Sequence, residues 1–427
     1  MKISAKTILK SGTALLATVA LLAPMAACGS SSSDGKTEIT IAFWGGNGSK
    51  EIMQKRVDAI KSQLKGIKIK LQWIPEDYDT KVQTMMSGNT APDIMEVAEA
   101  VNAYSSRGQL EDLTPYFKKL GIDATKRFGE AAVKMYSMDG KMYAAPDRVA
   151  PNVVFYNKDM FKEAGVDENI SEWDWDTLRE NLKKLTKRSG NKTTQWGLAE
   201  GMWWPWYMQW IYQNGGRLVS EDGKKAEINS PQNLETFEFY QDLMWKDHTV
   251  ATPQELANNG PDNLFAQGKL AMETTGFWNT GALKDAKINW GVSPLWHGKK
   301  EATALFTNAL ALTSQSKHKD EAAKVISLLT SKEGQKEIGT SGQDIPANVE
   351  AAADPSVEKG DWNTKGISIQ AWNDARKQAF PAPTIPKWNE MNTAFADGMT
   401  NTWAGKQSVK AGLDKAQEKL ERALKQN

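Results

Sequence analysis

The chain has 427 residues, of which 40% are hydrophobic and 25% are charged, and its formal net charge is +1. This length favours two lobes over one compact core, and the composition is that of a soluble globular protein. The near-neutral charge balance disfavours a nucleic-acid partner, because binding to phosphates requires an excess of Lys and Arg. Tryptophan is unusually frequent, with 17 residues against 12 phenylalanines and 9 tyrosines.

The N-terminus has the pattern of an export signal. Three lysines precede an uncharged apolar run, residues 14–27, which is too short for a convincing membrane span. Cys28, the only cysteine of the chain, follows small residues at the end of this run. It resembles the cysteine of a bacterial lipobox, which takes a lipid and becomes the mature N-terminus; ordinary cleavage near Ala26 is the alternative. We predict a signal peptide at 1–27, followed by lipidated Cys28 within a flexible tether, 28–36.

The first folded segment alternates strands with helices. Strands are predicted at 37–44, 67–73 and 93–97, and helices at 50–64 and 78–87. This β-α-β-α-β order predicts a parallel sheet with right-handed crossovers. The Gly-rich turn after the first strand lacks the spacing of a P-loop or of a dinucleotide-binding loop.

Later elements are predicted from the same signals. Ser230 is expected to cap a helix whose first residue is Pro231, and a strand is expected to end near Glu273. The remaining expectations are strands at 153–158 and 306–312, and helices at 159–164, 177–185, 320–329, from Ser331 onward, and 409–424.

Four tryptophans and one tyrosine crowd into residues 203–210. Pro205 ends any helix begun before it and can be the first residue of a helix that runs on from Trp206. Two interpretations remain open. The aromatic rings fill a core, because they bury the largest area per residue, or they line a cleft in which the C–H faces of pyranose rings lie on indoles.

Six segments occur in an order and approximate spacing that carry a family resemblance: 39–46, 91–94, 156–165, 268–272, 276–278 and 331–334. Together with the lipobox and the serine tether, they resemble the extracellular solute-binding lipoproteins of carbohydrate ABC importers, the maltose-binding-like family 1. The resemblance implies an α/β fold of two lobes, each a mostly parallel sheet flanked by helices. Three hinge crossings are implied near 147–152, 295–302 and 342–348. The N-terminal lobe would then comprise 37–147 with 302–343, and the C-terminal lobe 148–301 with 344–427.

The same resemblance implies ligand contacts between the lobes. Aromatic contacts are expected from Trp44, Trp203, Trp204, Trp206, Trp278 and Trp388, and polar contacts from Asn47, Glu96, Glu99, Asp147, Arg148, Glu273 and Asp344. For each tryptophan the alternative is core packing, and for each charged residue it is a surface or hinge ion pair. Val97 stands where the family often has an aromatic residue, which indicates a different sugar.

The function implied by the resemblance is that of a receptor and not of an enzyme. A monomer without a cofactor would capture an oligosaccharide, close around it, and deliver it to ABC permease subunits in the membrane, to which it is lipid-anchored on the extracytoplasmic face. No metal is expected, because the three histidines are scattered. The alternatives are a secreted glycoside hydrolase, with a carboxylate pair such as Glu96 and Glu273, or the same fold with a polyol or peptide ligand.

Overall fold

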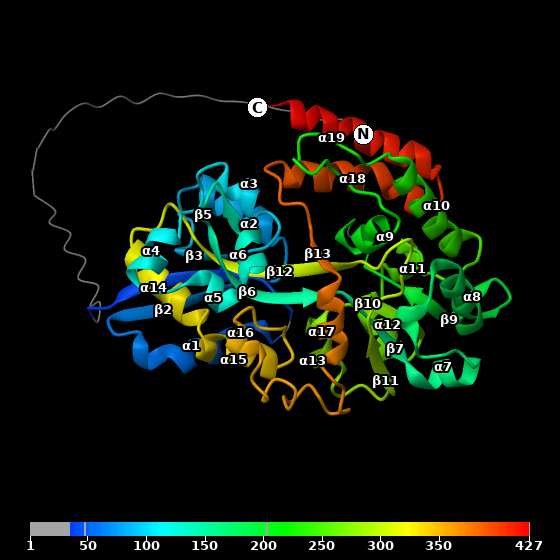
Figure 1. Cartoon of the computed structure of the whole chain (residues 1–427), viewed down its shortest axis with the longest axis horizontal. Coiled ribbons are helices and arrows are strands. Elements are labelled where there is room, and N and C mark those ends of the chain that lie inside the picture. Colours follow the sequence, from blue (N-terminus) through cyan, green and yellow to red (C-terminus); the bar gives the residue numbers. More distant parts are fainter. Residues whose placement is uncertain (1–34, 47, 202–203, 427) are drawn as a thin grey trace, which may run out of the picture. The chain divides into compact units, whose positions relative to one another are not determined.

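The computed structural model describes residues 35–46, 48–201 and 204–426 of the chain (Figure 1). The fold described below is that of one compact unit, Thr37–Asn427. The predicted signal peptide and Cys28 lie outside the described residues.

The first sheet is built around three parallel strands. Strand β1 (Thr37–Phe43) lies between β2 (Ile67–Trp73) and β3 (Ile94–Val97) and runs parallel to both. The crossovers contain α1 (Ser49–Ile60) and α2 (Tyr78–Ser87). The predicted β-α-β-α-β order with a parallel sheet is therefore confirmed.

Three strands from later parts of the chain extend this sheet. Strand β12 (Thr303–Leu312) pairs antiparallel with β3 and with β6 (Ala144–Pro151), and parallel with β13 (Ala379–Pro381). The sheet is therefore mixed. Five of its strands have the order β13-β12-β3-β1-β2, and the sixth, β6, also pairs with β12.

Short helices and a small hairpin fill the chain between β3 and β6. They are α3 (Val101–Ser105), α4 (Thr114–Lys119), α5 (Ala124–Phe128), α6 (Glu130–Met135), β4 (Ser137–Met138) and β5 (Lys141–Met142). After β12, α14 (Lys319–Leu329) packs on β1 and β12, and α15 (Lys332–Thr340) packs on α1. Two further short elements are η1 (Lys61–Gln63) and α16 (Val349–Ala352).

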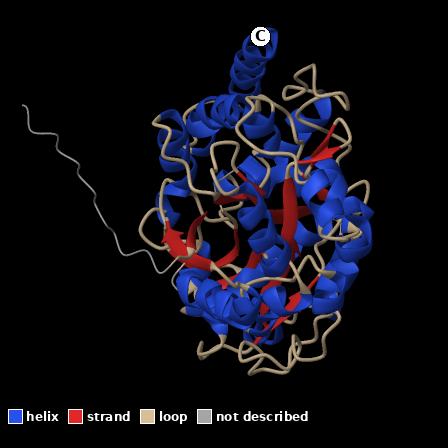
Figure 2. Cartoon of the chain, turned by 90° about the vertical axis from the view of Figure 1, so that its left-hand side faces the viewer, coloured by secondary structure: helices blue, strands red, loops and turns tan. Residues whose placement is uncertain are grey.

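The second sheet has the order β11-β7-β10-β9-β8. Strand β7 pairs antiparallel with both neighbours and β8 pairs antiparallel with β9, so that only β10 and β9 are parallel. The mostly parallel sheet expected for each lobe is therefore wrong for this sheet, because β8 and β9 form a hairpin and β7 runs against both β10 and β11. Its strands are β7 (Val153–Asn157), β8 (Lys187–Ser189), β9 (Lys192–Ala199), β10 (Leu270–Thr275) and β11 (Trp290–Ser293). The helices of this region are α7 (Lys158–Ala164), η2 (Ile170–Glu172), α8 (Trp175–Leu185), η3 (Trp204–Tyr207), α9 (Met208–Gln213), α10 (Pro231–Trp245), α11 (Pro253–Leu256), α12 (Pro261–Ala266), η4 (Phe277–Asn279) and α13 (Thr280–Leu283). Figure 2 shows the strands of the molecule enclosed by helices.

The chain passes from the first sheet to the second at Asn152, the one residue between β6 and β7, and it returns between Ser293 and Thr303. A third segment, residues 345–347, lies beside the first crossing. Its Ile345 O accepts a hydrogen bond from Val149 N, and its Ala347 N donates one to Asp147 O. The division into lobes stays a prediction, and its boundary at 147–148 falls inside β6, which belongs to the first sheet throughout.

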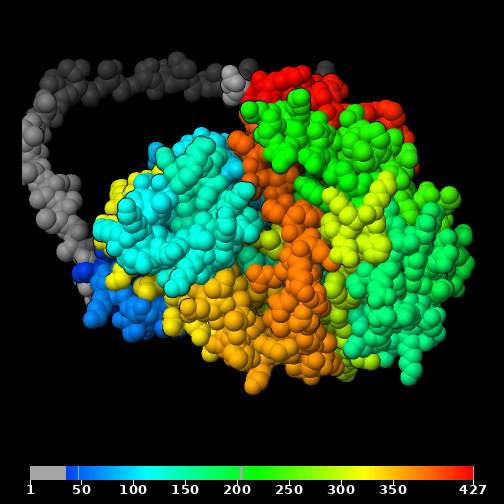
Figure 3. Space-filling view, in the orientation of Figure 1, coloured from blue at the N-terminus to red at the C-terminus, as the bar shows by residue number. Residues whose placement is uncertain are grey.

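The C-terminal part begins with α17 (Gln370–Lys377), which contacts strands of both sheets, and continues through β13 to α18 (Trp388–Trp403) and α19 (Val409–Lys425). In Figure 3 the orange segment of this part lies on the surface between the cyan and green segments, and the red C-terminal end lies above the green one. Helices α18 and α19 pack closely where two glycines meet, because a Cβ at Gly398 would lie 2.6 Å from Gly412 O.

Most predicted elements are confirmed with small shifts of their ends, and α2 has the predicted bounds. The helix expected from Trp206 differs: residues 204–207 form a 3-10 turn, and the α-helix begins at Met208. The 3-10 turn includes Pro205, whose nitrogen cannot donate a main-chain hydrogen bond.

Candidate functional site

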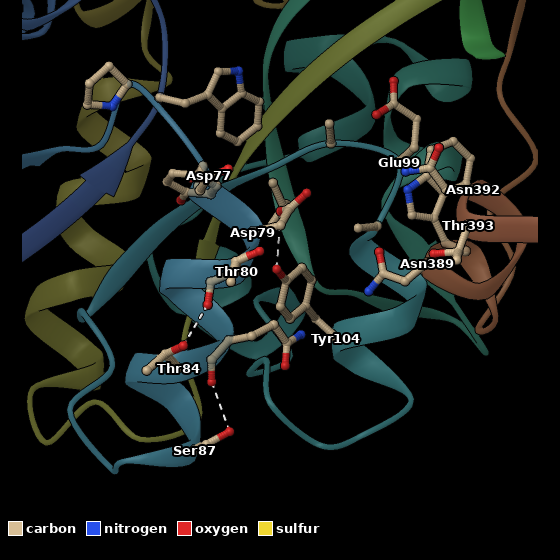
Figure 4. A pocket seen from close by; sticks show the side chains of 18 residues that line it. Asp77, Asp79, Thr80, Thr84, Ser87, Glu99, Tyr104, Asn389, Asn392 and Thr393 are labelled. Carbon is tan, nitrogen blue, oxygen red and sulfur yellow. Dashed lines mark hydrogen bonds between the residues drawn. The ribbon is translucent and has the colours of Figure 1, made fainter. Parts of the chain in front are cut away.

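A pocket of about 950 Å³ opens beside the carboxyl ends of β1 and β3. Trp44 follows β1, Ala98 and Glu99 follow β3, and the first turn of α2 forms one wall. The first turns of α18 supply the wall facing α2, as Figure 4 shows. Ligands of open α/β sheets commonly bind at the carboxyl ends of the strands, and this pocket has that position.

Aromatic side chains form much of the lining. The Trp44 and Tyr78 rings meet edge to face, with centroids 4.9 Å apart. The Tyr78 hydroxyl lies 2.9 Å from Glu96 O and 3.1 Å from Ala42 O, so that this ring is fixed to both strands. Trp388 lines the pocket from α18. Such rings offer flat apolar surfaces with few side-chain torsions to order on binding.

The polar lining combines carboxylates with amides. Asp77, Asp79 and Glu99 line the pocket together with Asn389 and Asn392. Burial raises the pKa of Asp79, and the Tyr104 hydroxyl, which donates to Asp79 Oδ1 at 3.3 Å, opposes that change. Burial also raises the pKa of Glu99 to about 7. These groups can accept hydrogen bonds from ligand hydroxyls, and the amides can both donate and accept.

Glu96 lies behind the pocket and does not line it. Its side chain is buried, and its carboxylate accepts hydrogen bonds from Trp44 N at 3.1 Å and from Asn308 Nδ2 at 3.0 Å. It also forms an ion pair with Arg148. Glu96 therefore fixes the main chain of Trp44 from behind.

The charged residues of the predicted crossings are buried and have internal partners. Asp147 pairs with Arg56 through contacts of 2.5 and 3.1 Å. Burial lowers the pKa of Arg148 to about 10, although the charge of Asp344 opposes this shift. Burial raises the pKa of Asp344 to about 7, and Arg148 lowers it. None of these charged side chains belongs to the described lining of the pocket.

A second aromatic group lies outside that lining. Trp206, Trp278 and Phe306 have ring centroids 4.9 to 6.2 Å apart, and Trp206 Nε1 donates to Thr274 O at 3.0 Å. Both tryptophans are partly exposed. The group combines the turn after β10, the turn before α9 and the first half of β12, so it forms a second candidate sugar wall.

Glu273, on β10, is buried and does not line the pocket. Burial raises its pKa well above the usual value, the neighbouring Asp262 raises it further, and Asn279 Nδ2 donates to its Oε2 at 3.2 Å. Asn47 and Trp203 lie outside the described residues, and the side chain of Trp204 is likewise not described.

The structure thus brings three of the predicted contacts into one pocket, Trp44, Glu99 and Trp388. Sequence reasoning missed the acidic and aromatic run Asp77-Tyr78-Asp79 and, across the pocket, Tyr104. The run lies at the start of a predicted helix that directly follows a predicted strand. Its position at the end of that strand could have indicated a ligand contact. Tyr104 offered no comparable signal.

Within the part of the chain that the structure describes, no helix is both long and apolar enough to cross a membrane. The described residues also contain no cluster of three or more His, Cys, Asp or Glu side chains placed to hold a metal ion.

Comparison with known proteins identifies the family. The family described as bacterial extracellular solute-binding protein matches residues 44–336, and the chain belongs to it. The galactooligosaccharide-binding protein of Bacillus subtilis is 23% identical over 386 residues, covering 86% of each chain. A maltooligosaccharide ABC transporter solute-binding lipoprotein of Streptococcus pneumoniae is 25% identical and covers 97% of this chain and 96% of its own.

Solved structures agree with this assignment. An ABC substrate-binding protein of Listeria monocytogenes, in complex with cycloalternan, superposes with a TM-score of 0.84 at 26% identity, over 91% of this chain and 99% of that one. The predicted α/β fold and the predicted family are therefore both confirmed.

Proposed function

We propose that this protein is the substrate-binding component of an ABC sugar importer and that it captures an oligosaccharide in the pocket beside β1 and β3. The observation that carries the proposal is the lining itself. Partly exposed Trp44 provides an apolar face beside the largely buried rings of Tyr78 and Trp388, and Asp79 and Glu99 provide acceptors for hydroxyl groups. Relatives of this chain include proteins named for binding galactooligosaccharide and maltooligosaccharide.

The proposed mechanism is capture followed by closure. A ligand favours a closed form only by the contacts that it makes better in that form. The two facing walls of the pocket support this mechanism, because α2 belongs to the first sheet's crossovers whereas α18 comes from the C-terminal part of the chain. The closed receptor then delivers the sugar to membrane permease subunits, with Cys28 carrying the lipid anchor of a monomer. Mass spectrometry of the mature N-terminus tests the anchor, and light scattering tests the monomer.

The alternative function, a glycoside hydrolase, would use Glu96 and Glu273 as its pair of catalytic carboxylates, and the surroundings of these two side chains do not favour that role. Glu96 has Arg148 and Asn308 as partners, and Glu273 has Asp262 and Asn279. Calorimetry with a panel of oligosaccharides, followed by chromatography of the incubated sugars, distinguishes the two functions. Binding with unchanged sugars supports the receptor, and cleaved products would contradict it.

Trp44→Ala tests whether this pocket is the one that binds. Truncation of an aromatic hot-spot residue at the centre of a binding site costs about 2 kcal/mol or more, so affinity is expected to fall by more than about tenfold. Trp245→Ala is the matched control, because Trp245 is 39% exposed at the end of α10 and does not line the pocket. Unchanged affinity of a folded Trp44→Ala protein would place the sugar elsewhere, with the Trp206, Trp278 and Phe306 group as the next position to test.

A further inference from the structure

Every charged side chain in the described lining of the pocket is acidic. Asp77 and Asp79 come from the start of α2, and Glu99 follows β3, whereas Lys, Arg and His are missing from the lining residues. A cation does lie near the rim: Arg107 interacts with Tyr104. It is outside the lining, however, and its guanidinium approaches Glu390 at 3.8 Å.

Glu99 is the buried member of this acidic group. The residue is only 9% exposed although it lines the pocket. Among the described residues, its carboxylate has no hydrogen-bond donor other than its own main-chain N–H. A carboxylate that is largely removed from water is stabilised by donors, so the Glu99 side chain is a site at which a donor on the ligand is favoured.

The surroundings of Glu99 also decide which donor fits best. Asp79 acts on Glu99 as a like charge, in addition to burial, and both disfavour the ionised carboxylate. A neutral hydroxyl satisfies the hydrogen bond but leaves that repulsion in place. A protonated amine satisfies the hydrogen bond and also offsets the negative charge of both carboxylates. A ligand carboxylate would add a further like charge, which is strongly unfavourable in a partly desolvated site.

We propose that the pocket binds saccharides that carry a protonated amine, with the amine placed at Glu99 and Asp79, in preference to their neutral counterparts, and that it rejects uronic acids. This inference rests on the proposed function as an oligosaccharide receptor and names the chemical class of the sugar.

The test compares saccharides that differ in one group. The neutral parents are cellotriose and maltotriose. In the amine derivatives one primary hydroxyl is replaced by an amine, and in the carboxylate derivatives the carbon of one primary hydroxyl is oxidised to a carboxylate. Each derivative is tested at every position that carries a primary hydroxyl. Calorimetry slightly above neutral pH and at low salt is expected to show at least one amine derivative binding about tenfold more tightly than its parent. The carboxylate derivatives are expected to bind more weakly than the parent, and both differences should shrink at high salt.

The same titrations give a second readout. Burial and Asp79 raise the pKa of free Glu99 to about 7, and a bound cation lowers it, so binding of the amine near neutral pH should release protons. Repeating the calorimetry in buffers with different ionisation enthalpies measures that release, and the neutral parent should release fewer protons.

Variants identify the side chains responsible. Glu99→Gln and, separately, Asp79→Asn should each reduce the ratio of amine affinity to parent affinity, and each substitution keeps the size of the side chain while removing its negative charge. Glu180→Gln removes the same charge from an exposed position on α8 outside the lining and should leave the ratio unchanged. If a neutral parent binds and no amine derivative binds more tightly, the amine preference is wrong while the receptor function stands. If no probe binds to the folded protein, the receptor function fails and this inference fails with it.

Discussion

At the scale of single residues, Glu96 shows how a buried side chain can serve the pocket without lining it. Its carboxylate joins the main chain of Trp44, the amide of Asn308 and the guanidinium of Arg148. The sequence places Glu96 at the end of a strand, where ligand contacts are common. It does not reveal that the side chain turns toward β12, because Asn308 lies 212 positions away in the chain.

Arg56 and Asp147 are a pair whose separation should be costly. Each side chain is 1% exposed, and Arg56 also donates to Gly334 O at 2.8 Å. Arg56→Met leaves the Asp147 carboxylate buried without its partner, so the free energy of unfolding should fall by roughly 3–5 kcal/mol in denaturant titrations. Lys55→Met is the control, because its ion pair with Glu337 is exposed and should contribute less than about 1 kcal/mol. If both substitutions lower the free energy of unfolding by the same amount, the buried Arg56–Asp147 pair contributes no more to stability than the Lys55–Glu337 pair.

Glu200 should make stability depend on pH. Its carboxylate accepts hydrogen bonds from Thr274 Oγ1 at 2.6 Å, Trp210 Nε1 at 2.9 Å and Gln209 Nε2 at 3.2 Å, yet burial raises its pKa from 4.5 to about 7. The folded state therefore binds a proton that the unfolded state has released. The stabilisation is complete below pH 4.5 and is lost as the pH rises toward 7.

Denaturant unfolding between these pH values checks the prediction against Glu200→Gln. The free energy of unfolding of the unchanged protein should decline with pH relative to that of the variant. Parallel pH profiles for the two proteins would contradict the raised pKa.

At the scale of elements, the parts of the fold with local signals were predictable. The bounds of α2 follow from the apolar spacing and from Gly88 at its end. Strand β13 gave no such signal, because its three residues become a strand only by pairing with β12, far away in the chain. The pocket shares this limitation: Trp44 and Glu99 follow predicted strands, whereas Asn389 and Asn392 reach it only because α18 packs near α3.

Helix α10 offers a test of a local signal. Ser230 Oγ accepts a hydrogen bond from Asn233 N at 3.3 Å, and Pro231 occupies the first turn. Ser230→Ala removes the cap and should cost about 1 kcal/mol of unfolding free energy. Ser171→Ala, at an exposed serine outside any cap, should change stability by less than about 0.5 kcal/mol. If both variants unfold at the same denaturant concentration, the cap contributes nothing to stability.

At the scale of the whole molecule, the pocket joins segments from both ends of the folded chain, from Trp44 to Thr393. A sugar that binds only to this assembled pocket must stabilise the folded state by mass action. At a concentration of about 100 times Kd, the unfolding free energy should rise by about 2.7 kcal/mol. Thermal unfolding with increasing sugar measures the effect, and Trp44→Ala should shift the dependence to higher concentrations. If a sugar is shown to bind but the melting temperature does not change with its concentration, the unfolded chain must bind the sugar equally well.

Asn152 has a consequence for how the two sheets can turn against each other. It is the single residue between β6 and β7, and three of its groups have partners: its N–H donates to Ala304 O, its carbonyl accepts from Thr303 Oγ1, and its side-chain amide nitrogen donates to Gln209 Oε1, whereas the buried Oδ1 has no partner among the described residues. Rotation at this point is therefore confined to one pair of backbone dihedrals, and it cannot occur without displacing the start of β12 and the helix that follows the tryptophan-rich stretch. A turn of one sheet against the other at Asn152 would therefore strain hydrogen bonds to β12 and to Gln209 of α9.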